Sequence, residues 1–222
     1  MDDPALKSIR ASYDQIADEY AHRLFHELER KPLDRELLTR FAAEVRGLGR
    51  VCDTGCGPGH VARFLHDAGA SVFGLDLSPR MVEQARQLNP EIPFQEGDMM
   101  ALDLADASLA GIKAFYAIVN IPEASLPLAF REMARVLQPG GLLLLAFHAG
   151  SEAIHAEELW GRRVSIDFFY FQPAAIRQLL ESAGFAIEEI VEREPYAPDV
   201  EHQSRRAYIF ARKPGSPARP AQ

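Results

Sequence analysis

The stretch Val51-Cys52-Asp53-Thr54-Gly55-Cys56-Gly57-Pro58-Gly59-His60 decides the fold class of this chain. A short apolar run ends at Asp53, three glycines follow at alternate positions, and an amphipathic segment starts at Val61. This order predicts a strand, a glycine turn and a helix. Glycine lets the backbone pass close to a ligand, and the first turn of a helix leaves backbone N–H donors unpaired. The stretch is therefore predicted to hold an anionic or carboxylate-bearing ligand.

The spacing of the glycines narrows the kind of ligand. A dinucleotide-binding turn has the form G-x-G-x-x-G, and its third glycine would fall at position 60, where the chain has His60. The third glycine is instead Gly59, so the stretch has the form D-x-G-x-G-x-G. This spacing makes a pyrophosphate a poorer fit. A tight strand-to-helix connection without a ligand is the alternative.

The D-x-G-x-G-x-G form resembles the first motif of the S-adenosylmethionine-dependent methyltransferases with a Rossmann-like fold. The resemblance implies an α/β fold: a doubly wound, mostly parallel seven-stranded sheet with an antiparallel last strand, N-terminal helices and a small cap insertion. It also implies S-adenosyl-L-methionine as the cofactor. The residues of this stretch that it assigns to cofactor binding are Asp53, Gly55, Gly57 and Gly59.

An acidic residue ends the second predicted strand, at residues 70–76. Asp76 lies about 20 residues beyond the glycine turn, which is the separation at which a carboxylate meets a ribose diol in nucleotide-binding βαβ units. A carboxylate can accept hydrogen bonds from both hydroxyl groups of the diol. The alternative is that Asp76 only caps the helix that starts after Ser78 and Pro79.

The third predicted strand, at residues 92–96, runs into Gly97, Asp98 and Met99. By resemblance, Asp98 accepts a hydrogen bond from the exocyclic amine of adenine, and the polarizable thioether of Met99 lies against the ring. Without the resemblance, these residues would indicate only a turn and a core contact. The resemblance also assigns to the cofactor site Leu77, Met81 and Phe115.

Two helices are expected before the glycine turn, at residues 7–29 and from residue 37 to about 47. The first contains Tyr13 and Tyr20 within a segment that resembles the Y-D-x-x-A-x-x-Y helix of many small-molecule methyltransferases. There the tyrosines close over the methionine end of the cofactor. By this resemblance Tyr20 contacts the cofactor and Tyr13 lines the acceptor pocket. The alternative is that both are half-buried packing residues.

Beyond the turn, apolar spacing predicts alternating helices and strands. The connection 192–206 is too short for a crossover helix, so the last two strands should be antiparallel. Helices are expected at residues 61–68, 81–88, 126–137 and 173–183, and the later strands at 109–119, 142–147, 185–191 and 207–211.

The acceptor side of the site is predicted from residues near the ends of the later strands. His148 follows the apolar strand at 142–147 and is the candidate general base, because a histidine can change charge near neutral pH. A structural or pocket-lining histidine is the alternative. Residues 149–171 lose periodicity and are rich in aromatic side chains, which favours a substrate cap. The alternative is that the aromatic block at 168–171 only covers core surface before the next helix. The predicted pocket residues are Tyr13, Asn120, Trp160, Phe169 and Tyr170.

The composition of the 222 residues, 47% hydrophobic and 25% charged, is that of an ordinary globular domain. We expect a single methyltransferase domain at 1–213, with an N-terminal helical segment at 1–47, the cap at 149–171 and a disordered tail at 214–222.

The net charge of −8 repels phosphate backbones, so nucleic acid is not expected as a partner. A monomer or a homodimer is expected.

Two cysteines provide neither a disulfide framework nor, with the scattered histidines, a metal site. No apolar run approaches the length of a membrane span, so no membrane partner and a cytoplasmic location are expected.

The predicted function is methyl transfer from S-adenosylmethionine to a small-molecule acceptor by in-line displacement, in which the protein mainly aligns the reactants and excludes water. One alternative is a catalytically silent protein that binds S-adenosylmethionine or acts as a scaffold. A nicotinamide-dependent oxidoreductase is another, disfavoured by His60.

Overall fold

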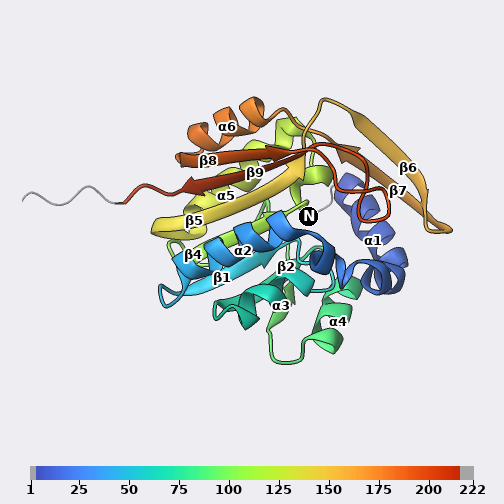
Figure 1. Ribbon diagram of the computed structural model, residues 1–222, viewed down its shortest axis with the longest axis horizontal. Helices are drawn as coiled ribbons and strands as arrows, with labels where there is room; N and C mark the ends of the chain where they lie inside the picture. Colours follow the sequence, from blue (N-terminus) through green and yellow to red (C-terminus); the bar gives the residue numbers. More distant parts are fainter. Residues whose placement is uncertain (1–3, 216–222) are drawn as a thin grey trace, which may run out of the picture.

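A computed structural model describes residues 4–215, and its main feature is one seven-stranded sheet (Figure 1). The strands are β1 (Arg50–Thr54), β2 (Ser71–Asp76), β3 (Phe94–Glu96), β4 (Leu109–Phe115), β5 (Leu137–His148), β8 (Ala186–Arg193) and β9 (Arg206–Arg212). Their order across the sheet is β3-β2-β1-β4-β5-β9-β8. Neighbouring strands from β3 to β5 are parallel, whereas β9 is antiparallel to both β5 and β8. The predicted fold class is confirmed.

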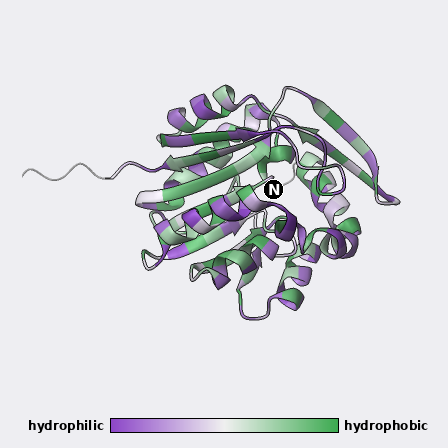
Figure 2. Cartoon of the chain, viewed as in Figure 1, coloured by the Kyte–Doolittle hydropathy of each residue, from purple (hydrophilic) through white to green (hydrophobic). Residues whose placement is uncertain are grey.

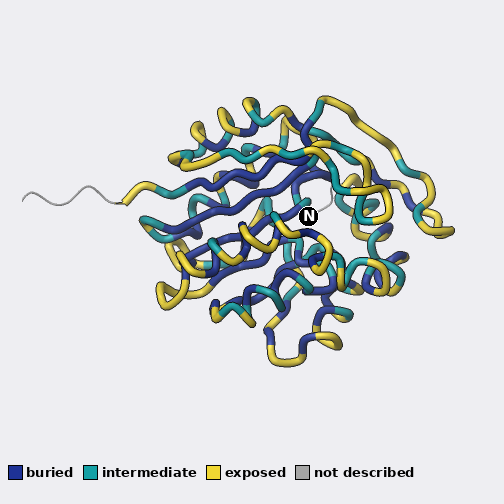
Figure 3. The backbone as a smooth tube through the Cα atoms, viewed as in Figure 1, coloured by how far each residue is buried: buried dark blue, intermediate teal, exposed yellow. Residues whose placement is uncertain are grey.

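Helices cover both faces of this sheet, because alternate residues of its central strands are apolar on both sides. Leu143 and Leu145 of β5 belong to one buried cluster, and Leu142 and Leu144 belong to another on the opposite face. Such double-sided burial is typical of parallel sheets, and Figures 2 and 3 show β5 as hydrophobic and buried. The helices are α1 (Pro4–Leu24), α2 (Pro32–Val45), α3 (His60–Asp67), α4 (Pro79–Leu88), α5 (Leu126–Val136) and α6 (Pro173–Ser182), with 3-10 turns η1 (Glu27–Arg30), η2 (Ile118–Asn120) and η3 (Glu123–Ser125).

The strand order reverses direction between β1 and β4. From β1 the chain adds β2 and β3 on one side and then returns to place β4 and β5 on the other. In open parallel sheets a ligand crevice forms at such a switch point, beyond the carboxyl ends of the strands. The glycine turn after β1 lies at this point.

The predicted cap is an ordered hairpin, not an aperiodic loop. It consists of β6 (Ala153–Leu159) and β7 (Arg162–Phe169), which form a separate two-stranded antiparallel sheet. Val164 and Ile166 of β7 are buried beside Ile16 and Ala17 of α1. Because most of the hairpin packs on another amphipathic element, and only its base at Phe168 and Phe169 reaches the main core, its apolar alternation is short and is interrupted by charges.

The fourth strand is shorter than predicted. It ends at Phe115, not at residue 119, because Tyr116 takes a positive φ of 52° and the chain then enters η2. Residues 216–222, most of the predicted disordered tail, lie outside the described residues. Within the described part of the chain, no helix combines the length and the apolar character needed to cross a membrane.

Candidate functional site

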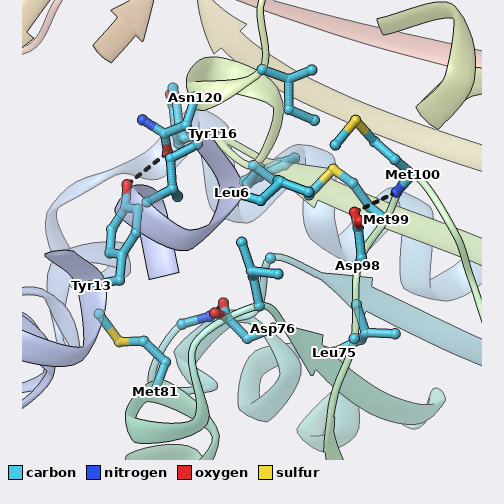
Figure 4. Close-up of a pocket in the computed structure, with 18 of the residues that line it drawn as sticks. Leu6, Tyr13, Leu75, Asp76, Met81, Asp98, Met99, Met100, Tyr116 and Asn120 are labelled. Atoms are coloured by element: carbon cyan, nitrogen blue, oxygen red, sulfur yellow. Dashed lines mark hydrogen bonds between the residues drawn. The ribbon is translucent and has the colours of Figure 1, made fainter. Parts of the chain in front are cut away.

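A cavity opens at the carboxyl edge of the sheet, at the switch point between β1 and β4 (Figure 4). Counting the part that is open to solvent, the empty space of this cavity is about 740 Å³. Its walls come from α1, the glycine turn, the end of β2 and the loops after β3 and β4. The lining residues are Leu6, Ile9, Tyr13, Tyr20, Gly55, Gly57, Leu75, Asp76, Leu77, Met81, Gly97, Asp98, Met99, Met100, Phe115, Tyr116, Ala117, Asn120 and Ile121.

The three glycines of the turn have different surroundings. All have positive φ: 63° at Gly55, 51° at Gly57 and 81° at Gly59. A Cβ on Gly55 would lie 2.5 Å from the Cβ of Ala117, and one on Gly59 would lie 2.7 Å from Cζ of Phe94. A Cβ on Gly57 would meet only Tyr20, at 3.6 Å. Gly55 and Gly57 line the cavity, whereas Gly59 allows close packing of α3 on the sheet.

Asp76 presents a carboxylate to the cavity from the end of β2. Its Oδ2 accepts a hydrogen bond of 2.8 Å from the N–H of Gly57, and its Oδ1 accepts one of 2.9 Å from the N–H of Ser78. Burial raises the pKa of Asp76 to about 6, against the opposing effect of the two backbone N–H donors; the nearby charge of Asp53 raises it further. Each oxygen retains acceptor capacity for a ligand hydroxyl.

Asp98 and Met99 lie on the opposite side of the cavity from Tyr13 and Met81 (Figure 4). The Oδ1 of Asp98 accepts a hydrogen bond of 2.8 Å from the N–H of Met100, which fixes the turn after β3. The cavity therefore has one carboxylate at each of two neighbouring strand ends.

Helix α1 closes one side of the cavity. The hydroxyl of Tyr13 donates a hydrogen bond of 2.8 Å to Oδ1 of Asn120, and Nδ2 of Asn120 donates one of 2.8 Å to the carbonyl oxygen of Asp167 in β7. Burial raises the phenol pKa of Tyr13 and of Tyr20. Both phenols therefore stay protonated at neutral pH, and each is able to donate a hydrogen bond.

Most of the predicted site residues come together at this cavity. They are Tyr13, Tyr20, Gly55, Gly57, Asp76, Leu77, Met81, Asp98, Met99, Phe115 and Asn120. The predicted residues that do not line it are Asp53, Gly59, His148, Trp160, Phe169 and Tyr170.

Asp53 is buried beneath the glycine turn. Its Oδ1 accepts a hydrogen bond of 2.8 Å from Nζ of Lys113, and the two side chains are 0% and 2% exposed. The two residues face each other in the register of β1 and β4. This ion pair removes the Asp53 carboxylate from the cavity wall, so its predicted contact with the cofactor has no geometric support.

His148 does not line the cavity; its ring lies 5.2 Å from that of Tyr116, which does, and its Nδ1 contacts β9 and the residues before it. It pairs with Arg206 in the register of β5 and β9, and its Nδ1 lies 2.8 Å from Nη1 of Arg206 and 2.7 Å from Oγ of Ser204. Burial and then the charge of Arg206 lower the pKa of His148 to about 3. The imidazole is neutral at neutral pH and its Nδ1 accepts a hydrogen bond from the guanidinium. This position does not support the predicted role of a general base.

The three aromatic residues predicted from the cap lie behind the first layer of the cavity. Trp160 contacts Tyr20 at a centroid distance of 5.8 Å. Tyr170 stacks on His148 at 4.9 Å. Phe169 packs against the core, 6.5 Å from Phe171. The structure therefore gives them packing contacts in place of the predicted acceptor contacts.

Sequence reasoning missed several lining residues, among them Leu6, Ile9 and Tyr116. Leu6 and Ile9 precede Tyr13 by seven and four positions, so helical periodicity places all three on one face of α1. The helical spacing in the sequence is therefore enough to place Leu6 and Ile9 beside Tyr13. No pattern in the sequence indicates the positive φ of Tyr116.

The doubly wound sheet, the glycine turn and the two carboxylates define the class of protein, a Rossmann-like domain built to bind a nucleoside-bearing ligand at its switch point. Within the described residues, no group of three or more His, Cys, Asp or Glu side chains is placed to hold a metal ion.

Comparison with known proteins narrows this class. Residues 51–141 match the family described as "Methyltransferase domain". A malonyl-[acyl-carrier protein] O-methyltransferase of Enterobacter lignolyticus is 31% identical over 154 residues, which cover 69% of this chain and 59% of that protein. The chain spans about half the length of the curated relatives it matches.

Solved structures share the fold. An S-adenosylmethionine-dependent methyltransferase from Mesorhizobium loti superposes with a TM-score of 0.61 at 25% identity, over 76% of this chain and 92% of that one. A [4+2]-cyclase superposes with a TM-score of 0.69 at 20% identity, over 96% and 98%. Over residues 51–141 the chain therefore matches a methyltransferase domain, and its fold is that of the S-adenosylmethionine-dependent methyltransferases with a Rossmann-like fold.

Proposed function

We propose that this protein transfers a methyl group from S-adenosylmethionine to a small-molecule acceptor. The observation that carries the proposal is the Asp76 carboxylate, which two backbone N–H groups hold at the cavity wall next to the glycine turn. A carboxylate fixed in this way suits a ribose diol. Asp98 and Met99 across the cavity suit an adenine amine and an adenine ring (Figure 4).

The turn and helix α1 suit the methionine part of the cofactor. Gly57 has no side chain to fill the cavity beside Tyr20, and Tyr20 lies over the turn from α1. When bound, S-adenosylmethionine supplies an activated methyl group on a sulfonium. The chain itself has to orient the acceptor, align it with that methyl group and exclude water.

The lining chemistry favours an acceptor that needs no protein base. Among the described residues that line the cavity, the titratable side chains are Asp76, Asp98 and three tyrosines, Tyr13, Tyr20 and Tyr116. Burial raises the pKa of each of these phenols, so none is a ready base. A carboxylate oxygen is nucleophilic without losing a proton. The O-methyltransferase relative, which acts on a malonyl group, supports this choice.

A screen of acceptors tests the proposal. Purified protein is incubated with S-adenosylmethionine and candidate acids, and formation of S-adenosylhomocysteine is followed together with the methyl ester. We expect turnover with a small carboxylic acid and none with its methyl ester. Binding of the cofactor without turnover by any acceptor would favour the catalytically silent alternative. Tight binding of a nicotinamide cofactor in place of S-adenosylmethionine would favour an oxidoreductase. A cytoplasmic location and a monomeric or dimeric state stay predictions.

A further inference from the structure

The tip of the β6–β7 hairpin has an unexpected residue in its turn. Leu159 pairs with Arg162, so Trp160 and Gly161 alone connect the two strands. Both have positive φ, 51° and 77°. This is the pattern of a type I′ turn, whose first position favours asparagine, aspartate or glycine. Bulky side chains avoid this left-handed conformation, so turn chemistry gives no reason for a tryptophan here.

The contacts of the Trp160 ring supply a reason. The ring lies edge-to-face with Tyr20, at a centroid distance of 5.8 Å and an interplanar angle of 71°. The guanidinium of Arg23 lies 5.6 Å from the Trp160 ring. Tyr20 and Arg23 are three positions apart on one face of α1, and Tyr20 lines the cavity. Trp160 therefore connects the hairpin tip to α1 at the rim of the cavity.

The rest of the hairpin follows α1 along its length (Figure 1). The Ser165 carbonyl oxygen accepts hydrogen bonds from Oγ of Ser8 and Ser12, at 3.1 and 3.4 Å, and the Ser165 N–H donates to Oγ of Ser12 at 2.9 Å. Closer to the sheet, Asn120 joins Tyr13 to the Asp167 carbonyl. The hairpin thus holds both tyrosines of α1, Tyr13 through Asn120 and Tyr20 through Trp160.

Helix α1 is also the wall that has to move for the cavity to open on this side. It supplies Leu6, Ile9, Tyr13 and Tyr20 to the lining. On its other side α1 is attached to α4 and to the residue that caps it: Oγ of Ser78 donates a hydrogen bond of 2.6 Å to Asp14, and Arg80 and Gln84 of α4 donate to Asp18. We expect α1, once loosened from the hairpin, to tilt about these contacts with α4.

We propose that the β6–β7 hairpin is a clasp on α1, and that the Trp160–Tyr20 contact holds α1 closed over the bound cofactor. In this arrangement Trp160 is a positioning residue, which acts on the cofactor through Tyr20. Release of the ligand requires that this contact breaks. The inference rests on the proposed function, because it takes the ligand beneath Tyr20 to be S-adenosylmethionine or its product.

The fluorescence of the wild-type protein tests this directly, because Trp160 is the single tryptophan of the chain. S-adenosylhomocysteine is titrated in parallel by calorimetry and by tryptophan emission. We expect the emission to change and to saturate at the calorimetric Kd. Calorimetric binding with unchanged emission would overturn the clasp but leave the proposed function intact. An absence of calorimetric binding would overturn the proposed function, and the clasp with it.

A substitution at the turn separates the clasp from the stability of the hairpin. Trp160→Asn removes the ring and puts a residue that the turn favours next to Gly161. We expect Kd for S-adenosylhomocysteine to rise about 2- to 10-fold, the effect of one aromatic pair. Without ligand, the amides of α1 should exchange hydrogen faster while those of the hairpin do not. Trp160→Phe should restore most of the affinity, because it keeps an aromatic ring.

Ile154→Ala is the matched control, because Ile154 is on the same hairpin and is 44% exposed. It should leave both Kd and exchange in α1 at wild-type values. Wild-type Kd and wild-type exchange of α1 in Trp160→Asn would overturn the clasp. Faster exchange throughout the hairpin in that variant would also overturn it, because Trp160 would then serve the fold of the hairpin itself.

Discussion

At the scale of single residues, the two carboxylates of the cavity carry the most information. Asp76 ends β2 and Asp98 follows the end of the neighbouring β3, and each accepts a hydrogen bond from a backbone N–H group of its own turn, that of Ser78 and that of Met100. Part of their orientation therefore follows from local backbone geometry; the spacing from the glycine turn predicted Asp76, and the resemblance assigned Asp98.

Asp76→Ala should weaken binding of S-adenosylhomocysteine about 10- to 100-fold, because hydrogen bonds to a charged group contribute about 1.5–3 kcal/mol. The side chain is on the cavity wall, so the fold should persist. Calorimetric titration and circular dichroism measure the two effects. An unchanged Kd in a folded variant would remove Asp76 from the ribose role.

The affinity for the cofactor should also depend on pH. The pKa of Asp76 is raised to about 6, so the ionised form, which accepts hydrogen bonds from both hydroxyls, is present above this pH and is lost as the pH falls through it. We expect the affinity, 1/Kd, to fall between pH 7.5 and pH 5 and to be halved near pH 6. Asp76→Asn, which does not titrate, is the control. The same pH dependence in that variant would assign the titration to another group.

His148 shows where sequence reasoning fails at this scale. His148 does follow an apolar strand, but its pKa is lowered by burial and then by the charge of Arg206, which is distant in sequence and adjacent in space. No pattern in the sequence around His148 indicates that Arg206 lies next to it. His148→Ala should consequently act on stability and not on the chemical step, which a comparison of melting temperature with single-turnover rate would show.

At the scale of elements, β1 and β4 are joined by the buried ion pair of Asp53 and Lys113. Lys113→Met leaves Asp53 as a buried carboxylate without its partner, and breaking such a pair typically costs about 3–5 kcal/mol. We expect this loss in the free energy of unfolding measured with urea. The double variant with Asp53→Asn should recover part of it. A single variant as stable as the wild type would show that the pair contributes little.

Substitution of Gly59 and substitution of Gly57 by alanine should affect the protein differently. Gly59→Ala places a Cβ against Phe94 and Asn89 at a positive φ, so we expect a loss of about 2–4 kcal/mol in unfolding free energy. Gly57→Ala meets only Tyr20 and projects into the cavity, so it should cost less stability and more cofactor affinity. Equal effects of the two variants on both quantities would contradict these separate roles.

The helices and strands of the main sheet could be predicted because each carries its own apolar period, its turn residues and a length that fits one layer. The hairpin could not, because β7 buries only Val164 and Ile166 and its core is supplied by α1. The end of β4 was overestimated for a related reason. The positive φ of Tyr116 is imposed by its surroundings and has no signature in the apolar run that precedes it.

At the scale of the whole molecule, elements far apart in sequence converge on one cavity: α1, the turns after β1, β2 and β3, and η2. The parallel sheet causes this convergence, because it brings the carboxyl ends of its strands to the same edge. The chemical identity of the methyl acceptor cannot be deduced from this architecture. A [4+2]-cyclase shares the fold over almost its full length, so the reaction depends on the side chains at the site.

The most direct test of the cofactor assignment is calorimetric titration of the purified wild-type protein with S-adenosylhomocysteine, read together with the melting temperature. Saturable binding at one site per chain and a melting temperature that rises with ligand concentration are the predicted result. Neither heat of binding nor a rise in melting temperature at millimolar ligand would contradict the account.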